Sequence, residues 1–277
     1  MEVRYTTNQK GFSALSTTEL RENFLIETLF KKNSIIMVYS DIDRSITGSA
    51  VPLNKVLKLT ASKKEMAADY FTERREVGII NIGNSGTVTI DGVVYNMETK
   101  DGLYIGKGCK NIEFKSKNAK NPALFYFVSY PAHSSYPDYY IPYKNATRRE
   151  LGTIEDCNKR VINQYIHPGI MPTCQLVMGL TELEIGSVWN TMPAHTHQRR
   201  SEVYMYFNIN PDSFVVHLIG EPENTRHIII RDKQAVLSPS WSLHSGVGTK
   251  NYSFIWAMGG ENQVFDDMDW IPMESMK

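Results

Sequence analysis

Two series of short extended segments restrict this chain to an all-β architecture. From residue 35 onward apolar residues recur at every second position, which is the side-chain period of a strand. Turn signals such as Gly83-Asn84-Ser85-Gly86 and Asp91-Gly92 separate the segments. Many short strands joined by such turns are typical of a β-sandwich or β-barrel. The predicted strands cover residues 35–39, 55–59, 77–82, 87–90, 93–97, 102–105, 112–116 and 123–129, and then 174–178, 181–185, 214–219, 227–230, 235–237 and 252–258.

The first 34 residues carry a helical signal instead. Thr17 or Thr18 is placed to cap a helix, and Glu19 and Glu22 would follow in its first turn. Apolar residues then recur at helical spacing at positions 20, 24, 25 and 29. The segment therefore predicts one short N-terminal helix.

A break rich in proline and tyrosine, at residues 130–143, divides the strands into two series. We expect an N-terminal domain of residues 1–140, a linker of residues 141–165 and a C-terminal domain of residues 166–277. The two series resemble each other. Residues 73–82 align with 198–207 when one residue is dropped, 103–108 align with 236–241, and 125–128 align with 254–257. This internal similarity indicates a duplicated domain.

Composition excludes several classes of partner. The chain has 30 basic and 30 acidic residues, so its charge gives no reason to expect binding to nucleic acid or to an acidic membrane. The three cysteines are widely spaced and form no Cys-x-x-Cys pair, which favours a reducing compartment over a disulfide framework. No apolar run reaches the length of a membrane span, and no signal peptide is evident. We expect a soluble cytoplasmic protein that acts on a small molecule.

The candidate chemistry lies in the second series, at Pro193–Phe207. His195 and His197 are separated by one residue, so on an extended segment both imidazoles project to the same face and can share one ion. Glu202 follows after a short polar loop, and a hairpin would return its carboxylate to the histidines. His244, in a later turn-rich stretch, supplies a third imidazole. Three nitrogens and one carboxylate suit zinc, iron, manganese or nickel rather than calcium. The first series lacks histidines at the matching places, so we expect no metal site there.

The spacing His-x-His-x4-Glu, followed much later by Pro-x4-His, resembles the paired metal motifs of the cupins, which are small antiparallel barrels. There are two departures from that pattern: Trp241 stands where the second motif usually has glycine, and the gap between Gly186 and His195 is longer than usual.

Longer blocks also resemble one cupin family, the 5-keto-4-deoxyuronate isomerases (4-deoxy-L-threo-5-hexosulose-uronate ketol-isomerases). These blocks are residues 71–83, 189–197, 238–250 and 260–269, and the similarity covers nearly the full chain.

The resemblance implies a mainly β fold of two cupin-like (jelly-roll or RmlC-like) barrels with a short N-terminal helix. It implies one Zn²⁺ per chain, other divalent metals being possible, held by His195, His197, Glu202 and His244. It also implies a hexamer in the cytoplasm. The implied reaction converts 5-dehydro-4-deoxy-D-glucuronate (4-deoxy-L-threo-5-hexosulose uronate) to 3-deoxy-D-glycero-2,5-hexodiulosonate through a metal-stabilised enediolate, in the breakdown of uronates from pectin or glycosaminoglycans. Gln198 and Ser201 stand where other members differ.

Such a substrate carries a carboxylate, and two arginines flank the metal motif. Arg199 and Arg200 are therefore the candidates for substrate binding, since a guanidinium can hold a carboxylate with two hydrogen bonds. The group that moves the proton is not identified by the sequence. Tyr204 and Tyr206 are candidates by position, although aromatic residues alternating on a strand are often part of the core.

Two other functions use the same residues. A cupin dioxygenase would place iron at these ligands and would need oxygen. A sugar-binding protein would use the metal only to brace the barrel. In that case no turnover would depend on His195. Anaerobic turnover by zinc-loaded protein excludes the first of these, and loss of turnover in folded His195→Ala excludes the second.

Overall fold

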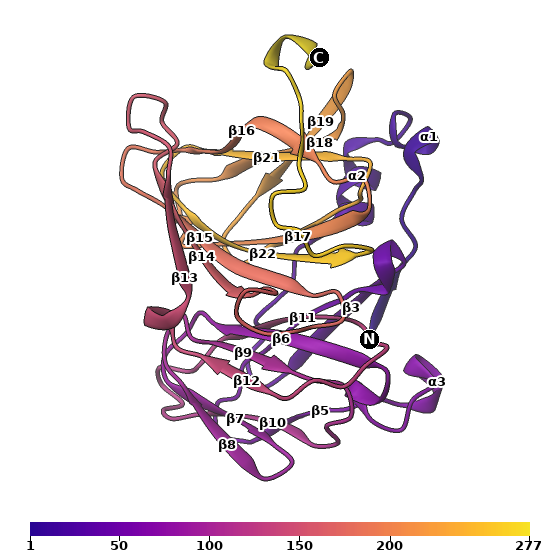
Figure 1. Cartoon of the computed structure of the whole chain (residues 1–277), viewed down its shortest axis with the longest axis vertical. Coiled ribbons are helices and arrows are strands. Elements are labelled where there is room, and N and C mark those ends of the chain that lie inside the picture. The colour runs from indigo at the N-terminus through magenta and orange to yellow at the C-terminus, as the bar shows by residue number, and fades with distance from the viewer.

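A computed structural model describes residues 1–277 and shows four β-sheets stacked in layers (Figure 1). The mainly β fold expected from the sequence is confirmed. Each outer sheet packs on one large inner sheet to form a barrel, and the two large sheets pack back to back.

The first barrel pairs a seven-stranded sheet with a four-stranded sheet. The large sheet has the order β1 (Glu2–Arg4), β3 (Ile35–Ser40), β4 (Ile46–Ala50), β11 (Phe125–Pro131), β6 (Arg75–Asn81), β9 (Gly102–Ile105) and β12 (Tyr139–Ile141). The small sheet has the order β5 (Leu57–Leu59), β10 (Ile112–Ser116), β7 (Gly86–Ile90) and β8 (Val93–Met97). A short helix, α3 (Lys63–Met66), follows β5.

The second barrel pairs a seven-stranded sheet with a five-stranded sheet. Its large sheet has the order β13 (Thr147–Leu151), β14 (Arg160–Ile166), β15 (Val177–Leu183), β22 (Ser253–Gly260), β17 (Arg200–Phe207), β20 (Ala235–Ser238) and β2 (Leu25–Ile26). The smaller sheet has the order β19 (Asn224–Ile230), β18 (Val215–Glu221), β21 (Leu243–Gly248), β16 (Trp189–Thr196) and β23 (Asp269–Trp270).

The same strand order recurs in the centres of the two large sheets. β4-β11-β6-β9 in the first barrel corresponds to β15-β22-β17-β20 in the second. The internal repeat read from the sequence is thus confirmed, because the segments aligned there fall on β6 and β17, on β9 and β20, and on β11 and β22.

Three apolar clusters fill the spaces between the layers. One lies inside each barrel, and the largest, with 22 buried residues, lies between the two large sheets. Every residue of β17 is buried, because one face of this strand lines the second barrel and the other faces the first barrel. Phe114, Phe125 and Phe127 fill the interior of the first barrel.

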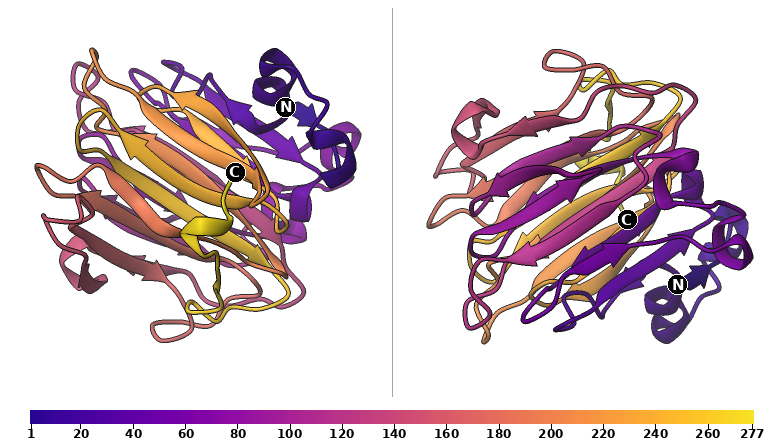
Figure 2. Two further views of the ribbon diagram at one scale, coloured as in Figure 1. Left: turned by 90° about the horizontal axis from the view of Figure 1, so that it is seen from above. Right: turned by 90° about the horizontal axis from the view of Figure 1, so that it is seen from below.

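The N-terminal segment forms two short helices, α1 (Gln9–Phe12) and α2 (Thr17–Phe24), at one edge of the layers (Figure 2). The cap of α2 is Ser16, rather than Thr17 or Thr18 as expected, and its side chain forms a capping box with Glu19. The chain thus forms two helices where one was expected, and the expected apolar positions 25 and 29 lie beyond the end of α2, where Leu25 and Ile26 form β2. No helix has the length and hydropathy that a membrane-spanning helix requires.

Strand pairing departs from the expected domain boundaries in two places, and the boundaries themselves remain a prediction. The N-terminal helices pack on the second barrel, where Phe12 and Phe24 contact Trp241, and β2 pairs with β20. The expected linker, residues 141–165, contains β13 and most of β14, which extend the second large sheet. All five residues of β13 are exposed, so this edge strand carries no apolar alternation that would reveal it.

Candidate metal centre

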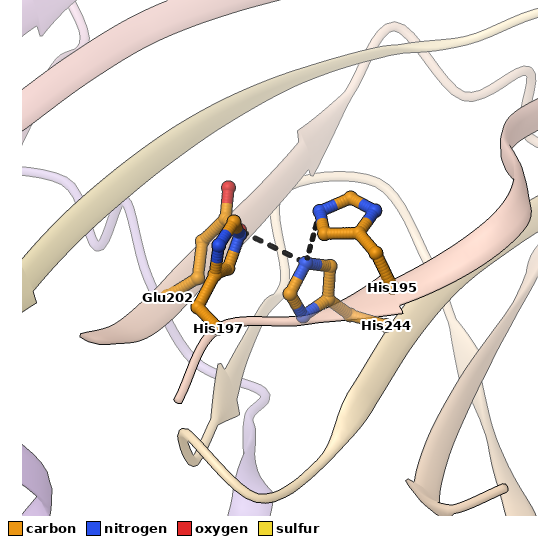
Figure 3. Close-up of side chains that lie close together, drawn as sticks. All are labelled: His195, His197, Glu202 and His244. Carbon is orange, nitrogen blue, oxygen red and sulfur yellow. Dashed lines mark hydrogen bonds and ion pairs between the residues drawn. The ribbon is translucent and has the colours of Figure 1, made fainter. Parts of the chain in front are cut away.

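Four side chains from three strands meet inside the second barrel (Figure 3). His195 on β16 lies directly opposite His244 on β21, in the smaller sheet. His197 follows the end of β16, and Glu202 projects from β17 in the facing large sheet. The expected hairpin is wrong, because β16 and β17 belong to different sheets and the loop between them turns a corner. The carboxylate therefore reaches the imidazoles across the barrel.

The distances within this cluster fit one divalent ion. His195 Nε2 lies 3.0 Å from His244 Nε2, which lies 3.1 Å from Glu202 Oε2. His197 Nε2 lies 3.5 Å from the same carboxylate oxygen, and the four ligand atoms all lie within 4.8 Å of one another. Two ligands that are each about 2.1 Å from one metal ion are separated by roughly 3.0 to 3.4 Å. The donor set and its spacing therefore match a metal site.

The other ring nitrogen of each histidine contacts a polar neighbour outside the cluster. His197 Nδ1 donates to the carbonyl oxygen of Asp267 at 2.5 Å, which leaves the lone pair of Nε2 directed into the cluster. His195 Nδ1 lies 3.3 Å from Thr191 Oγ1, and His244 Nδ1 lies 3.3 Å from Ser238 Oγ. These contacts orient all three rings before any ion binds, which is the usual arrangement of histidine ligands.

Burial keeps His195 and His244 in the neutral form that binds metals. The four side chains belong to residues no more than 4% exposed. Burial, followed by the nearby charges of His197, Arg200 and Arg160, lowers the pKa of His195 to about 3. Burial likewise lowers the pKa of His244 well below its usual value. Both rings therefore present an unprotonated nitrogen at neutral pH.

A cavity of about 50 Å³ lies beside the cluster. Its polar lining includes Thr181, Asn190 and Thr191, and Tyr204 and Trp256 form part of its wall. Phe265 and Met268, from the segment between β22 and β23, also line it. The cavity has room for only a few waters. A ligand larger than a few waters therefore requires part of this lining to move.

The two arginines expected to bind substrate occupy different environments. The Arg199 side chain is 70% exposed and its Nε lies 3.8 Å from Glu261. Arg200 is 1% exposed and lies behind His197, where its Nη2 donates to the Asp267 carbonyl oxygen at 3.0 Å. Neither residue lines the cavity. Arg200 is placed to support the loop that orients His197.

A third arginine, Arg160, was missed from the sequence. Its charge acts on His195, although it too lies outside the cavity lining. Arg160 is 9% exposed and lies on the same face of β14 as Ile162, toward the interior of the second barrel. Its Nη1 donates to the Asn158 carbonyl oxygen, its buried Nε has no partner, and no carboxylate pairs with it. The polar stretch before Arg160 favoured a linker, and residues 160–164 show no clear apolar alternation that would have indicated a strand.

The two tyrosines proposed as proton carriers differ in their access to the cavity. Tyr204 lines it, whereas the Tyr206 hydroxyl lies 2.7 Å from Nδ1 of the buried His217. Burial, followed by the charge of Glu202, raises the pKa of Tyr204 well above its usual value. Tyr204 therefore keeps its proton at neutral pH, so it is a proton donor rather than a base.

The buried His217 predicts how the free energy of unfolding depends on pH. Burial lowers its pKa to about 3, whereas the unfolded chain binds a proton near pH 6.5. Below pH 6.5 only the unfolded state is protonated, so the free energy of unfolding falls by about 1.4 kcal/mol per pH unit toward pH 3. Denaturant unfolding of wild type and His217→Gln between pH 7 and pH 4 should show a shallower decline in the variant. Equal slopes would contradict a neutral buried His217.

The comparisons with known proteins agree with this fold and site. Residues 24–273 match the KduI/IolB family. A protein named 4-deoxy-L-threo-5-hexosulose-uronate ketol-isomerase, from Lachnoclostridium phytofermentans, is 58% identical over 277 residues, which is the full length of both chains. A protein of the same name from Caldicellulosiruptor bescii is 53% identical, also over the full length of both.

Among solved structures, an IolB-like protein from Salmonella typhimurium LT2 has a TM-score of 0.72 at 12% identity. The match covers 90% of this chain and 97% of the other. An oxalate decarboxylase from Lactobacillus farciminis has a TM-score of 0.62 at 9% identity and covers 89% of this chain and 88% of the other. At these identities the structural matches show a shared fold.

Proposed function

Because the chain belongs to the KduI/IolB family, it is an isomerase of 4-deoxy-L-threo-5-hexosulose uronate, and we propose that the reaction takes place at His195, His197, Glu202 and His244. The observation that carries this assignment is the buried cluster itself. It is a preorganised set of three imidazoles and one carboxylate with its outer hydrogen bonds already made. The product is 3-deoxy-D-glycero-2,5-hexodiulosonate.

The four residues of the cluster would hold one divalent ion, for which we propose zinc. Zinc binds imidazole nitrogen and carboxylate oxygen at the spacing found here. When bound, the ion would polarise the substrate carbonyl and the adjacent hydroxyl and stabilise negative charge on the enediolate.

The protein's own residues would position the substrate and transfer its proton. Moving the carbonyl from C1 to C2 requires loss of a proton at C2 and gain of a proton at C1. Tyr204 lines the cavity, and we propose that its hydroxyl gives a proton to C1 while the proton lost from C2 restores the phenol. Trp256, Phe254 and Phe265 form an apolar wall that excludes water, which strengthens charge interactions at the site.

The substrate carboxylate requires a cation, and the three arginines near the site can be separated by kinetics. We expect Arg160→Gln to raise KM about tenfold with a smaller change in kcat, because a hydrogen bond to a charged group contributes about 1.5–3 kcal/mol. Arg199→Gln is the matched control and should leave KM near that of wild type, since Arg199 projects into solvent. Arg200→Gln should lower metal content through His197 instead.

In the reverse result, Arg199→Gln raises KM and Arg160→Gln does not. That result would show that Arg199, beside the metal motif, binds the substrate carboxylate. In that case the segment of residues 197–201 must rearrange when the substrate binds. Thermal melting of each variant shows whether a change in KM reflects loss of fold.

We also propose, from the family resemblance, that the protein works as a hexamer in the cytoplasm, on uronates released from pectin or glycosaminoglycans. Size-exclusion chromatography with light scattering measures the mass directly, and a dimer or monomer would overturn the hexamer. Activity of the full reaction under anaerobic conditions would separate the isomerase from an oxygen-dependent cupin enzyme.

The experiment that tests the proposed function follows the purified protein and 4-deoxy-L-threo-5-hexosulose uronate by proton NMR in deuterated water. With an isomerase, the aldehyde signal should be replaced by that of the C1 methylene of the ketose. If the transferred proton exchanges with solvent, deuterium should be incorporated at C1. No consumption of this compound by metal-loaded protein would overturn the proposal.

A further inference from the structure

A second cavity, of about 470 Å³, lies at one end of the first barrel, the barrel without the metal ligands. It is lined by Tyr39, Ile46 and Phe71, by residues of α3 and by Arg75 at the start of β6. Its volume falls in the range of pockets that bind small organic molecules. No residue of this cavity belongs to the metal centre, so its ligand would be separate from the isomerisation.

Arg75 is the polar group that distinguishes this cavity. Its residue is 8% exposed, and no carboxylate forms an ion pair with it. Nε donates to Ser129 Oγ at 3.0 Å, and Nη2 donates to the carbonyl oxygens of Arg44 at 2.6 Å and Ser129 at 2.8 Å. Nη1 makes no hydrogen bond within the chain, and it is not fully enclosed by other atoms. The guanidinium is therefore held rigidly while one nitrogen remains available.

The internal repeat shows where this guanidinium lies in the barrel. Arg75 is the first residue of β6 and pairs with Pro131, at the end of β11. Arg200 is likewise the first residue of β17 and pairs with Gly260, at the end of β22. Both barrels thus carry a buried arginine at the same end, on the strand face that points inward. Two residues further along, the second barrel has Glu202 and the first has Val77.

The first barrel has therefore kept the cation without a neighbouring acid. In the second barrel the charge of Glu202 acts on Arg200, whereas no acid is near enough to affect Arg75. Burial lowers the pKa of Arg75 to about 10, so it remains charged at neutral pH. A buried cation without a counter-ion is costly, and an anion bound beside it would offset that cost.

The rest of the lining favours an organic anion over an inorganic one. Lys64 lines the cavity without an ion-pair partner, and Glu65 is the one acid in the lining. Lys63 and Arg74 also line it, but each is paired, with Asp69 and Glu73 respectively. Most of the remaining wall is apolar or aromatic, including Tyr39, Ile46, Met66 and Phe71. Such a surface suits a ring or short apolar body that carries one carboxylate.

We propose that the cavity at the end of the first barrel is a second binding site, in which Arg75 holds the carboxylate of a small organic acid and the apolar wall packs against its body. Two sources share this chemistry: a sugar acid related to the substrate, whose ring face packs on Tyr39 and Phe71, and an unrelated aromatic or aliphatic acid. The site needs no metal.

Ligand-observed NMR on the full-length protein distinguishes these sources. The probes are benzoate and D-galacturonate, with benzamide and methyl D-galacturonate as matched neutral controls. Benzoate should bind and benzamide should not. Arg75→Gln should weaken benzoate binding by about tenfold or more, because one charged contact is lost, while Arg75→Lys should retain part of it. Galacturonate that displaces benzoate indicates a sugar-acid site, and galacturonate that does not indicates an unrelated acid.

Binding of benzoate that is unchanged by Arg75→Gln, or benzamide binding as tightly as benzoate, would overturn the proposal. Because Arg75→Gln removes buried hydrogen bonds and can impair folding, a crystal of wild-type protein soaked with 4-bromobenzoate provides a second test. Anomalous bromine density in the cavity, with the carboxylate on Nη1 of Arg75, is expected. A carboxylate side chain from another copy of the chain seated on Arg75, or an empty cavity at saturating probe, would also overturn it.

Discussion

His244→Ala is expected to abolish metal binding and isomerisation while leaving the protein folded. His244 Nε2 lies between His195 Nε2 at 3.0 Å and Glu202 Oε2 at 3.1 Å, so it is central to the cluster. Loss of a group that merely orients a ligand lowers metal affinity by about 10- to 100-fold. Loss of a ligand should cost more than that. Elemental mass spectrometry gives the metal content, and initial rates at saturating substrate give the activity.

The matched control is His227→Ala, which removes an exposed histidine from the neighbouring hairpin of β18 and β19. It should retain the metal content and turnover of wild type. Circular dichroism and thermal melting compare the folds of the two variants. Normal turnover by His244→Ala at a metal content well below that of wild type would show that the cluster is a brace and not the reaction centre.

Glu76→Gln is expected to lower the free energy of unfolding by roughly 3 to 5 kcal/mol, the largest effect on stability that we predict. Glu76 is fully buried between the barrels. Its Oε1 accepts from the backbone N–H of Gln175 and Leu176 at 2.8 and 2.9 Å. Its Oε2 accepts from the Cys174 N–H and the Tyr104 hydroxyl, both at 2.8 Å. An amide replaces one acceptor with a donor that would face other donors.

The carboxylate of Glu76 belongs to the first barrel, whereas three of its four donors belong to the loop before β15 of the second barrel. The contact therefore joins the two barrels. Glu150→Gln is the matched control, because its side chain is 64% exposed and exposed ion pairs contribute at most about 1 kcal/mol. Urea unfolding followed by both fluorescence and circular dichroism measures the difference. Equal midpoints for the two variants would show that Glu76 does not anchor this loop.

Much of the architecture followed from local patterns in the sequence. Alternation of apolar residues located most strands, and the similarity of residues 73–82 to 198–207 identified the strands that occupy equivalent places in the two barrels. The metal cluster was also predictable. On an extended segment, period-two spacing places His195 and His197 on one face. The same motif supplied Glu202, and the later motif supplied His244.

The errors concern features that depend on contacts between distant segments. β13 is fully exposed and so has no apolar period, while β2 consists of two residues that pair with a strand about 210 positions later in the chain. The burial of Arg200 behind His197 was not predicted, because the sequence does not show that the backbone of Asp267 passes there. Glu76 carried no signal, because three of its four donors are backbone groups about 100 residues away.

The measurement that tests the central claim most directly is metal content together with turnover on one preparation, before chelation, after chelation and after return of Zn²⁺. Isomerisation at His195, His197, Glu202 and His244 predicts about one divalent ion per chain, loss of turnover with the ion, and recovery when it is restored. Metal-free protein that isomerises the uronate as fast as loaded protein would contradict the account.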